Sequence, residues 1–386
     1  MIGTLALFFT RGVSLREWLR RGMFDREKRL YEEHLRQGHV RRVVWLTYGT
    51  GDAAIAARLH AEGRLHPSVH VVDMPRPFAS KAGGLAYSLV APLLHYRQLH
   101  AATVIKSNQM DGAWTALLAG ALHGKPVLVR TGFTLSLFEA YEHGDRAARV
   151  RLARWVERIT YRFGDMAAVS SRRDREYLAG TYSVPDIRLL PNYVDTDLFH
   201  PGDAPRTPGR MVFVGRLHPQ KNLAALIPVL REAGCGLDVY GSGQEEAALR
   251  QLAAHCGADV RFHGSIANDR LPDVLRPAET FILPSTFEGM PKALLEAMAC
   301  GCVCVGADVP GVNEVILDGV NGLLAPSPNG EGFRTVLRRL AQADKPALSE
   351  AGVAHIRARY SLSAVAQAEA AMLEELASRG KGDARR

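Results

Sequence analysis

The stretch PSTFEGMPKALLEAMACG, residues 284–301, has the composition of a loop that runs into a helix. It follows an apolar run that ends at Leu283, and its first half is rich in Ser, Thr and Gly. Pro291 suits the first turn of a helix, and Gly301 is favoured just beyond a helix end. Free amides at the helix start, together with the permissive backbone of Gly289, can hold an anion. The segment therefore predicts a strand, a ligand-binding loop and a helix.

The same alternation of short apolar runs and helical periods extends through nearly the whole chain. Strands separated by helices of ten or more residues indicate βαβ units and parallel sheets, whose ligands collect at the carboxyl ends of the strands. We expect strands at residues 4–9, 42–46, 69–72, 103–106, 127–130, 166–170, 210–214, 236–240, 260–262, 280–283 and 303–305. We expect helices at residues 84–95, 147–163, 245–255, 331–342 and 361–378.

The length of 386 residues favours two domains over one compact core. The run 191–209 is dense in Pro, Gly, Asp and Asn, as is typical of a linker. We predict an α/β protein in which two doubly wound, Rossmann-like domains, residues 1–190 and 210–360, face each other across a cleft. Residues 361–386 are expected to form a helix that crosses back to the first domain and a frayed, charged tail.

The composition is that of a folded protein, with 47% hydrophobic and 23% charged residues. The net charge of +8 and the isoelectric point near 9.3 favour anionic partners such as nucleotide diphosphates, acidic lipid headgroups or nucleic acid. No run reaches the roughly 18–20 apolar residues that span a bilayer. We interpret residues 3–9 as a buried first strand rather than a signal peptide, and expect a cytoplasmic protein.

The sequence predicts no metal site. Cys300, Cys302 and Cys304 alternate along an expected strand, and no His or second Cys pair lies at metal-site spacing, so we expect small buried apolar residues. The D-x-D run of Asp195 and Asp197 falls in the expected linker, where we discount a metal as well.

Two glutamates stand out in the opening stretch. Glu288 lies in the loop, and Glu296 lies about one and a half turns into the helix. Carboxylates offer several acceptor sites to the hydroxyls of a sugar and of a ribose. The alternative is that Glu288 is a turn residue and Glu296 an exposed helix charge.

A second informative block is FVGRLHPQKN, residues 213–222. An expected strand ends at Gly215, and the cations Arg216 and Lys221 follow before a helix that Asn222 could cap. Two such cations could bind a diphosphate and neutralise its negative charge. A surface loop with solvated cations is the alternative.

Together these blocks resemble the nucleotide-sugar signature of the retaining family 4 (group 1) glycosyltransferases of GT-B fold. The resemblance extends to PNYVD at residues 191–195, GVNEVI at 311–316 and GVNGLL at 319–324. It implies a metal-independent enzyme that needs no cofactor besides its nucleotide-sugar substrate. The enzyme would transfer the sugar, with retained configuration, to a glycan or lipid-linked acceptor in the synthesis of cell-surface polysaccharide or glycoconjugate.

The resemblance also implies roles for single residues. In the family the first glutamate contacts the transferred sugar and the second the ribose, which assigns Glu288 and Glu296. The amides after the first glutamate approach the sugar and the diphosphate, which assigns Gly289 and Met290, and the cation pair on the diphosphate falls on Arg216 and Lys221. Further donor contacts are expected at Gly12, Gly215, His263 and Leu295, although His263 could instead be a packed histidine.

The acceptor side offers fewer signals. Gly12 follows the first strand and lets its loop approach the diphosphate, Arg11 beside it borders the acceptor, and Ser14 can cap the next helix. Residues that follow two further strands are expected at the cleft: Asn108, Gln109 and Arg130. Alternatively, Asn108 ties down a turn and Arg130 pairs with Asp111.

The sequence departs from the family at one position that bears on mechanism. Many members have a histidine where this chain has Asn108 and Gln109, so no general base is evident. This agrees with a front-side displacement in which a phosphate oxygen of the donor takes the proton of the hydroxyl. The alternatives within or near this fold are a nucleotide-sugar epimerase and a non-catalytic partner subunit. A dinucleotide dehydrogenase is disfavoured, because no G-x-G-x-x-G is complete.

Basic residues crowd two amphipathic helical stretches, residues 16–29 and 146–162. These stretches could dock on an anionic membrane surface, as would suit a peripheral enzyme with a membrane-borne acceptor, whereas no nucleic acid is expected as a partner. A solvated helix face over a buried apolar stripe is equally consistent with the pattern.

Overall fold

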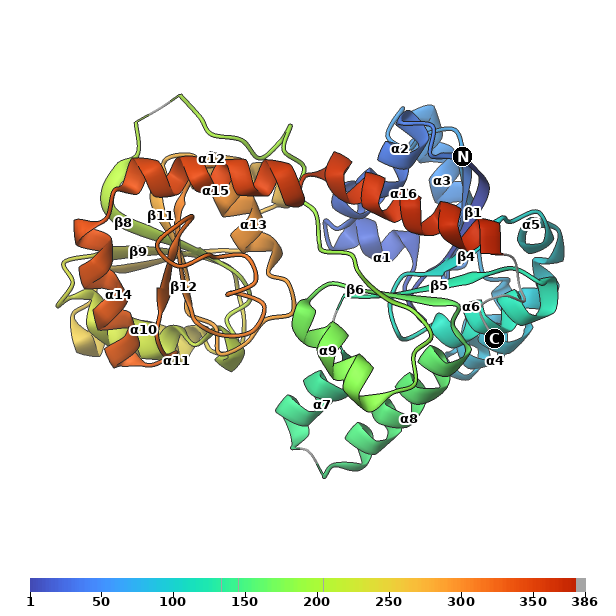
Figure 1. Cartoon of the computed structure of the whole chain (residues 1–386), viewed down its shortest axis with the longest axis horizontal. Helices are drawn as coiled ribbons and strands as arrows, with labels where there is room; N and C mark the ends of the chain where they lie inside the picture. The colour runs from blue at the N-terminus through green and yellow to red at the C-terminus, as the bar shows by residue number, and fades with distance from the viewer. Residues whose placement is uncertain (133, 145, 204, 380–386) are drawn as a thin grey trace. The chain divides into compact units, whose positions relative to one another are not determined.

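The computed structural model describes residues 1–132, 134–144, 146–203 and 205–379. These residues form two compact units: Met1–Pro191 with the C-terminal segment that begins at Val365, and Asn192–Ala364. Ala204 in the expected linker and the expected tail from residue 380 onward lie outside the described residues. Each unit is built on one parallel sheet with helices on both faces (Figure 1).

The described strands of the first unit form a seven-stranded parallel sheet in the order β3-β2-β1-β4-β5-β6-β7. Their bounds are β1 (Ile2–Phe8), β2 (Val40–Leu46), β3 (Val69–Val72), β4 (Val104–Ser107), β5 (Val127–Thr131), β6 (Met166–Val169) and β7 (Ile187–Leu189). The interior strands β4 and β6 are buried along their whole length, as expected of a parallel sheet covered on both faces.

Helices cover both faces of this sheet, with α2 and α16 on one face and α4, α6 and α8 on the other (Figure 1). The helices are α1 (Leu15–Arg20), α2 (Phe24–Arg36), α3 (Asp52–Ala61), α4 (Lys81–Leu94), α5 (Tyr96–His100), α6 (Ala113–His123), α7 (Leu135–His143), α8 (Ala148–Phe163), α9 (Arg172–Thr181) and α16 (Leu362–Arg379). Ser14 caps α1 as predicted, because its Oγ accepts a hydrogen bond from Glu17 N at 3.0 Å.

The second unit contains a six-stranded parallel sheet of described strands in the order β10-β9-β8-β11-β12-β13. The strands are β8 (Thr207–Val214), β9 (Gly236–Tyr240), β10 (Val260–Gly264), β11 (Ala278–Leu283), β12 (Val303–Ala307) and β13 (Leu323–Ala325). The helices are α10 (Leu223–Leu230), α11 (Glu246–Cys256), α12 (Leu271–Leu275), α13 (Lys292–Ala299), α14 (Gly330–Gln342) and α15 (Lys345–Arg359). Figure 1 shows α10, α11 and α14 on one face and α13 and α15 on the other.

Two parallel sheets in an α/β arrangement confirm the predicted fold class, and every expected strand overlaps an observed one. The sequence analysis missed β7 and β13, because three residues are too few to show a period. It also gave Asn222 the wrong role. Asn222 has a left-handed backbone with φ 57°, and its amide does not cap α10 but donates to Pro284 O at 3.0 Å and Pro328 O at 2.9 Å.

The expected linker is part of the second unit from Asn192 onward. Val194 N donates to Tyr360 O at 2.8 Å, and Leu362 N donates to Val194 O at 2.9 Å. These backbone bonds hold the segment before β8 against the segment that precedes α16. Composition alone indicated a linker here because turn-forming residues are common to linkers and to ordered surface loops.

Cys300, Cys302 and Cys304 are buried and free, as predicted. Burial raises the pKa of the Cys300 and Cys302 thiols to about 12, so both are protonated at neutral pH. No helix in the described chain combines the length and the hydrophobicity that crossing a bilayer requires.

A buried charge cluster attaches α16 to the sheet of the first unit. Glu369 on α16 is fully buried, and its carboxylate meets Lys106 Nζ of β4 at 2.5 Å and His34 Nε2 of α2 at 2.8 Å. Burial alone would raise the pKa of Glu369, but Lys106 and His34 hold this pKa well below its ordinary value. The C-terminal helix is therefore held to the first unit by three charged or polar groups from three elements.

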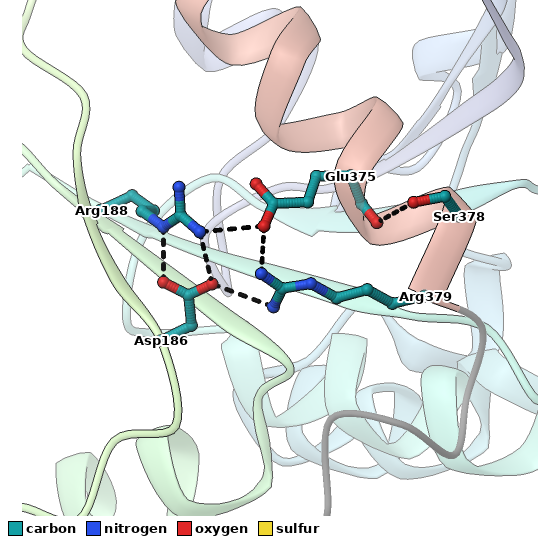
Figure 2. Close-up of polar contacts among 5 residues, drawn as sticks. All are labelled: Asp186, Arg188, Glu375, Ser378 and Arg379. Atoms are coloured by element: carbon teal, nitrogen blue, oxygen red, sulfur yellow. Dashed lines mark hydrogen bonds and ion pairs between the residues drawn. The ribbon is translucent and has the colours of Figure 1, made fainter.

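A second, more exposed network lies at the end of α16 (Figure 2). Asp186 accepts hydrogen bonds from Arg188 at 2.6 Å and from Arg379 at 3.0 Å, and Glu375 accepts one from Arg188 at 2.9 Å and another from Arg379. Because solvent screens ion pairs of this kind, the network adds little stability. The buried cluster at Glu369 is the stronger attachment.

We expect Glu369→Gln to lower the free energy of unfolding by about 3–5 kcal/mol, because Lys106 would stay buried without a counter-charge. Lys106→Met/Glu369→Leu removes both charges and should restore most of the loss. Urea unfolding of the native protein, the single variant and the double variant measures these free energies. Equal losses of stability in the two variants would contradict the prediction.

The stability difference between the native protein and Glu369→Gln should also depend on pH. Since the folded pKa of Glu369 is lowered, its contribution is complete above the ordinary carboxyl range and is lost as the pH falls through and below that range. The stability difference between the native protein and Glu369→Gln should therefore shrink on acidification. A difference that grows toward acid pH would show that the carboxylate is not stabilised in its charged form.

Candidate functional site

The strand order reverses once in each sheet, between β1 and β4 in the first unit and between β8 and β11 in the second. Ligands of open parallel sheets bind at the carboxyl ends of the strands at such a point. Arg216 and Lys221 follow β8 and Glu288 follows β11, while Gly12 follows β1 and Asn108 follows β4. These five predicted site residues thus belong to the loops of the switch points.

The centre of the second unit's site is an ion pair between a buried carboxylate and a partly buried lysine. Glu288 is 8% exposed, and its Oε1 accepts hydrogen bonds from Lys221 Nζ at 2.5 Å and from Ser285 Oγ at 2.6 Å. A buried carboxylate is costly unless a cation and hydrogen-bond donors compensate it, and here both do. Lys221 is therefore no solvated surface cation, and the pair joins the loop after β8 to the loop after β11.

Backbone and amide hydrogen bonds hold the rest of the Glu288 loop. Its partners come from the loop after β8, from the loop after β12 and from the segment before β8. The bonds are Thr286 N to Gln220 O (2.9 Å), Gln220 Nε2 to Phe287 O (2.9 Å), Glu288 N to Pro310 O (3.0 Å) and Asn192 Nδ2 to Met290 O (2.9 Å). The loop is thus fixed before any ligand arrives.

Two backbone donors in this loop remain unused. Within the described residues, the amide N–H groups of Gly289 and Met290 form no hydrogen bond, although the loop around them is fully engaged. They immediately precede α13, whose N-terminus adds positive potential. Amides of this kind can bind an anion, which is the role that the sequence predicts for this loop.

Arg216 is exposed and makes no ion pair within the described chain, so its guanidinium is available to a ligand. The loop that carries it packs against the loop after β9. A Cβ atom at Gly241, where φ is 150°, would lie 1.8 Å from Gly215 O. Only glycine allows this approach, which sets the course of the backbone beside Arg216.

Glu296 is 5% exposed, so the alternative that it is an exposed helix charge is wrong. Its Oε1 accepts a hydrogen bond from Asn268 Nδ2 at 3.1 Å. Leu295 is fully buried in the hydrophobic core, and its amide N–H donates to Pro291 O at 3.3 Å. Leu295 therefore positions α13, and both its side chain and its amide are already engaged.

His263 is not a packed core histidine, because its side chain is 38% exposed. Its ring stacks on Tyr240 at 4.5 Å, and Nε2 lies 2.6 Å from Asp238 Oδ1, which Arg210 also approaches. Burial would raise the pKa of Asp238, but Arg210 and His263 lower it overall. The strand ends of β9 and β10 therefore present a fixed aromatic surface at His263, where a donor contact was expected.

In the first unit, an exposed ion pair joins the switch-point loops. Arg11 donates from Nε and Nη2 to the carboxylate of Asp111 at 2.9 and 3.2 Å, and Gly12 beside it has φ 76°. Asn108 N donates to Phe8 O at 2.9 Å. Gln109 Oε1 accepts a hydrogen bond from Gly132 N at 3.0 Å, so its amide supports the loop after β5.

The alternative pairing of Arg130 with Asp111 is wrong, because Asp111 pairs with Arg11. Arg130 Nη1 instead donates to Thr131 O at 2.5 Å. Arg130 is half-buried, and burial lowers the pKa of its guanidinium.

Comparison with known proteins decides the family. Residues 208–343 match the family described as glycosyl transferases group 1, and residues 28–198 match Glycosyltransferase Family 4. D-inositol 3-phosphate glycosyltransferase of Frankia alni is 30% identical over an alignment of 296 residues, and the match covers 69% of this chain and 69% of the relative. The chain belongs to glycosyltransferase family 4.

Other relatives agree with this assignment. Alpha-maltose-1-phosphate synthase of Mycobacterium tuberculosis is 25% identical over 311 residues, 71% of this chain and 79% of the relative. Among solved structures, Anabaena HepE in complex with UDP and glucose aligns with a TM-score of 0.70 and 19% identity, over 97% of this chain and all of the other. Sucrose-phosphate synthase of Thermosynechococcus elongatus aligns with a TM-score of 0.74 and 17% identity, over 98% of this chain and 100% of the other. These structures establish the GT-B fold of the glycosyltransferase.

Sequence reasoning missed several supporting residues of the glycosyltransferase. Ser285, Asn192 and Asn268 each bond a residue that the sequence did identify, and Gln220 bonds the backbone of Phe287 beside Glu288. The partners of Gln220, Asn192 and Asn268 lie at distances along the chain that no local pattern reveals. Ser285 alone had a local signal, since it precedes Glu288 by three residues in a turn. The described residues of the glycosyltransferase contain no group of three His, Cys, Asp or Glu residues that could hold a metal ion.

Gly311 offers a test of how the Glu288 loop is held. Its φ is 81°, and an added Cβ would lie 2.4 Å from both Glu288 O and Gly289 O. We expect Gly311→Ala to strain the contact by about 1–3 kcal/mol and to speed hydrogen exchange of the Thr286 and Glu288 amides roughly tenfold or more.

The matched control is Gly319→Ala, because Gly319 has φ 73° but open space around its Cβ position. It carries the same backbone penalty without the clash. Hydrogen exchange followed by mass spectrometry should show faster exchange at residues 284–290 only for Gly311→Ala. Equal exchange in both variants would contradict the role of Gly311 as a support of the loop.

Proposed function

We propose that the protein is a retaining, metal-independent glycosyltransferase that moves a sugar from a nucleoside-diphosphate donor to a glycan or lipid-linked acceptor. The observation that carries this proposal is the buried Lys221–Glu288 pair beside the unused amides of Gly289 and Met290. A site with a cation, unused amides and a positioned carboxylate suits a ligand that joins an anionic group to a hydroxylated one. Synthesis of cell-surface polysaccharide or glycoconjugate is the setting that we propose.

The donor would be held mainly by charge and by backbone amides. We place the diphosphate on Arg216, Lys221 and the amides of Gly289 and Met290, which compensate the charge that develops as the sugar leaves. Glu288 would accept hydrogen bonds from hydroxyls of the sugar, and Glu296 from the ribose diol. Because Lys221 already touches Glu288, it would also link the sugar end of the donor to its diphosphate.

The proposed transfer needs no general base from the loop after β4. That loop offers the amides of Asn108 and Gln109, which do not accept a proton at neutral pH. The bond between the sugar carbon and the diphosphate oxygen breaks, a bond to the acceptor oxygen forms on the same face, and the hydroxyl proton passes to the leaving diphosphate. Because Arg216, Lys221 and two amides would compensate the negative charge of the diphosphate, the site supports a reaction without a metal.

We also propose that the first unit docks on an anionic membrane surface. The exposed side chains of α8 are basic or apolar, and its acidic residue Glu157 is buried, where it accepts hydrogen bonds from Ser136 N and Tyr182 Oη. Trp155 and Leu152 on the same helix are each 61% exposed. A helix face of this composition suits the interface of an acidic bilayer.

A panel of UDP-, GDP- and ADP-sugars tests the donor assignment. We expect one class to bind and to be hydrolysed slowly, and Glu288→Gln to lower the transfer rate about 100- to 1000-fold because it loses a charged contact to the sugar. The control is Glu350→Gln, because Glu350 is an exposed acid on α15. Absence of nucleotide binding would refute the transferase, and equal rates in both variants would refute the role of Glu288.

Chelation tests the absence of a metal from the reaction. We expect EDTA to leave the transfer rate unchanged, because the residues proposed for the diphosphate carry the charge compensation themselves. Lys221→Met should in contrast lower the rate strongly without making the enzyme respond to added Mg²⁺ or Mn²⁺. Loss of activity in EDTA that Mg²⁺ or Mn²⁺ restores would refute the metal-independent reaction.

A further inference from the structure

Large apolar side chains are exposed unevenly over this protein. On α4, α5, α6, α7 and α8 of the first unit, the following are more than two-fifths exposed: Leu85, Leu89, Leu93, Leu94, Tyr96, Leu118, Leu122, Tyr141, Leu152, Trp155 and Phe163. Isolated exposed leucines are ordinary, whereas a gathering on one layer of helices marks an interaction surface. The same layer of helices contains a hollow.

A pocket of about 790 Å³ lies among α4, α7 and α8, within the size range of small-molecule sites. Its wall is mostly apolar and includes Leu85, Trp114, Leu135, Leu152, Trp155 and Ile159. We call this hollow the apolar pocket. A polar ligand would lose hydrogen bonds there, because most of the wall offers neither donor nor acceptor.

The apolar pocket adjoins a smaller polar one at the carboxyl end of β1. Arg11 lines both pockets, and the chain neighbours Gly84 and Leu85 line one each. The polar pocket, of about 380 Å³, also contains Gly12, Ser80 and Lys81. None of its described lining residues is acidic, and Lys81 forms no ion pair within the described residues. The polar pocket therefore favours an anionic group.

We propose that the apolar pocket takes the hydrocarbon chain of a phosphorylated lipid acceptor and that the polar pocket takes its headgroup. The proposal rests on the proposed function and narrows its acceptor to the lipid-linked class. A hydrocarbon chain matches the mostly apolar wall, and a phosphate matches Lys81 and the guanidinium of Arg11, which also pairs with Asp111. The basic face of α8 would bring the same unit to the anionic bilayer in which such a lipid resides.

Binding of linear alkyl phosphates to the full-length protein, below their micelle concentrations, tests the proposal directly. Affinity should rise about fourfold for each added methylene until the chain fills the pocket, because each methylene leaves water. An alkyl alcohol of equal length should bind more weakly, since it lacks the charge for Arg11 and Lys81. Affinity that does not change with chain length would overturn the proposal.

Tryptophan fluorescence can show where the alkyl chain of the ligand binds. Trp114 and Trp155 line the apolar pocket, whereas Trp18 and Trp45 are buried in the core of the same unit. An alkyl phosphate that carries bromine along its chain should quench the emission of Trp114 and Trp155. Quenching that persists when both are replaced by Phe would place the chain elsewhere and overturn the proposal.

Matched variants separate pocket binding from general surface binding. Leu152 and Leu93 are 61% and 63% exposed, and only Leu152 is among the pocket-lining residues. Leu152→Glu should abolish the chain-length dependence, whereas Leu93→Glu should keep it. Lys81→Met should weaken binding of the alkyl phosphate and leave binding of the alkyl alcohol unchanged. If both leucine variants lost the chain-length dependence equally, the alkyl chain would bind to the helix surface and not inside the pocket, which would overturn the proposal.

The donor assay keeps this proposal distinguishable from the proposed function. Nucleotide binding by the second unit should be the same in Leu152→Glu and in the native protein. If the nucleotide binds and a water-soluble glycan accepts the sugar as well as a lipid-linked one does, the lipid pocket is refuted and the transferase stands. If no nucleotide binds, the proposed function fails whatever the alkyl phosphates do.

Discussion

The buried carboxylate of Glu288 sets the geometry on which the donor side depends. A carboxylate cannot leave water without a cation, and the cation comes from Lys221 in a loop 67 residues earlier in the chain. The two loops can meet because β8 and β11 are neighbours in the sheet. Ser285, Gln220 and the unused amides take their places around this pair, so a single electrostatic requirement orders a site drawn from distant segments.

The same requirement shapes the first unit. Glu369 is fully buried among Lys106 and His34, and satisfying its charge fixes the C-terminal helix against β4 and α2. The exposed arginines and acids at the end of that helix supplement this attachment (Figure 2). Although α16 follows both sheets in the sequence, it packs on the first unit, because the ion-pair partners of its buried Glu369 lie there.

The two units present different chemistry at their switch points. The second unit offers charges, amides and a carboxylate, as suits a compact polar ligand with a diphosphate. The first unit offers a polar pocket that adjoins an apolar one, under helices with exposed Leu, Trp and Arg side chains. A family 4 glycosyltransferase needs two substrates, and this difference agrees with a nucleotide sugar on one unit and an amphiphilic acceptor on the other.

The sequence by itself determined the alternation of strands and helices, the parallel sheets and the loop from Pro284 to Pro291, because these depend on local periodicity and on turn and cap residues. It also identified Glu288, Glu296, Arg216 and Lys221 through a family pattern. Tertiary structure decided that Lys221 meets Glu288, that Asn222 bridges two loops instead of capping a helix, and that Glu369 and Lys106 form a buried pair. These contacts join residues far apart in the chain, and the cost of burying an unpaired charge or amide selects them only once the sheets have formed.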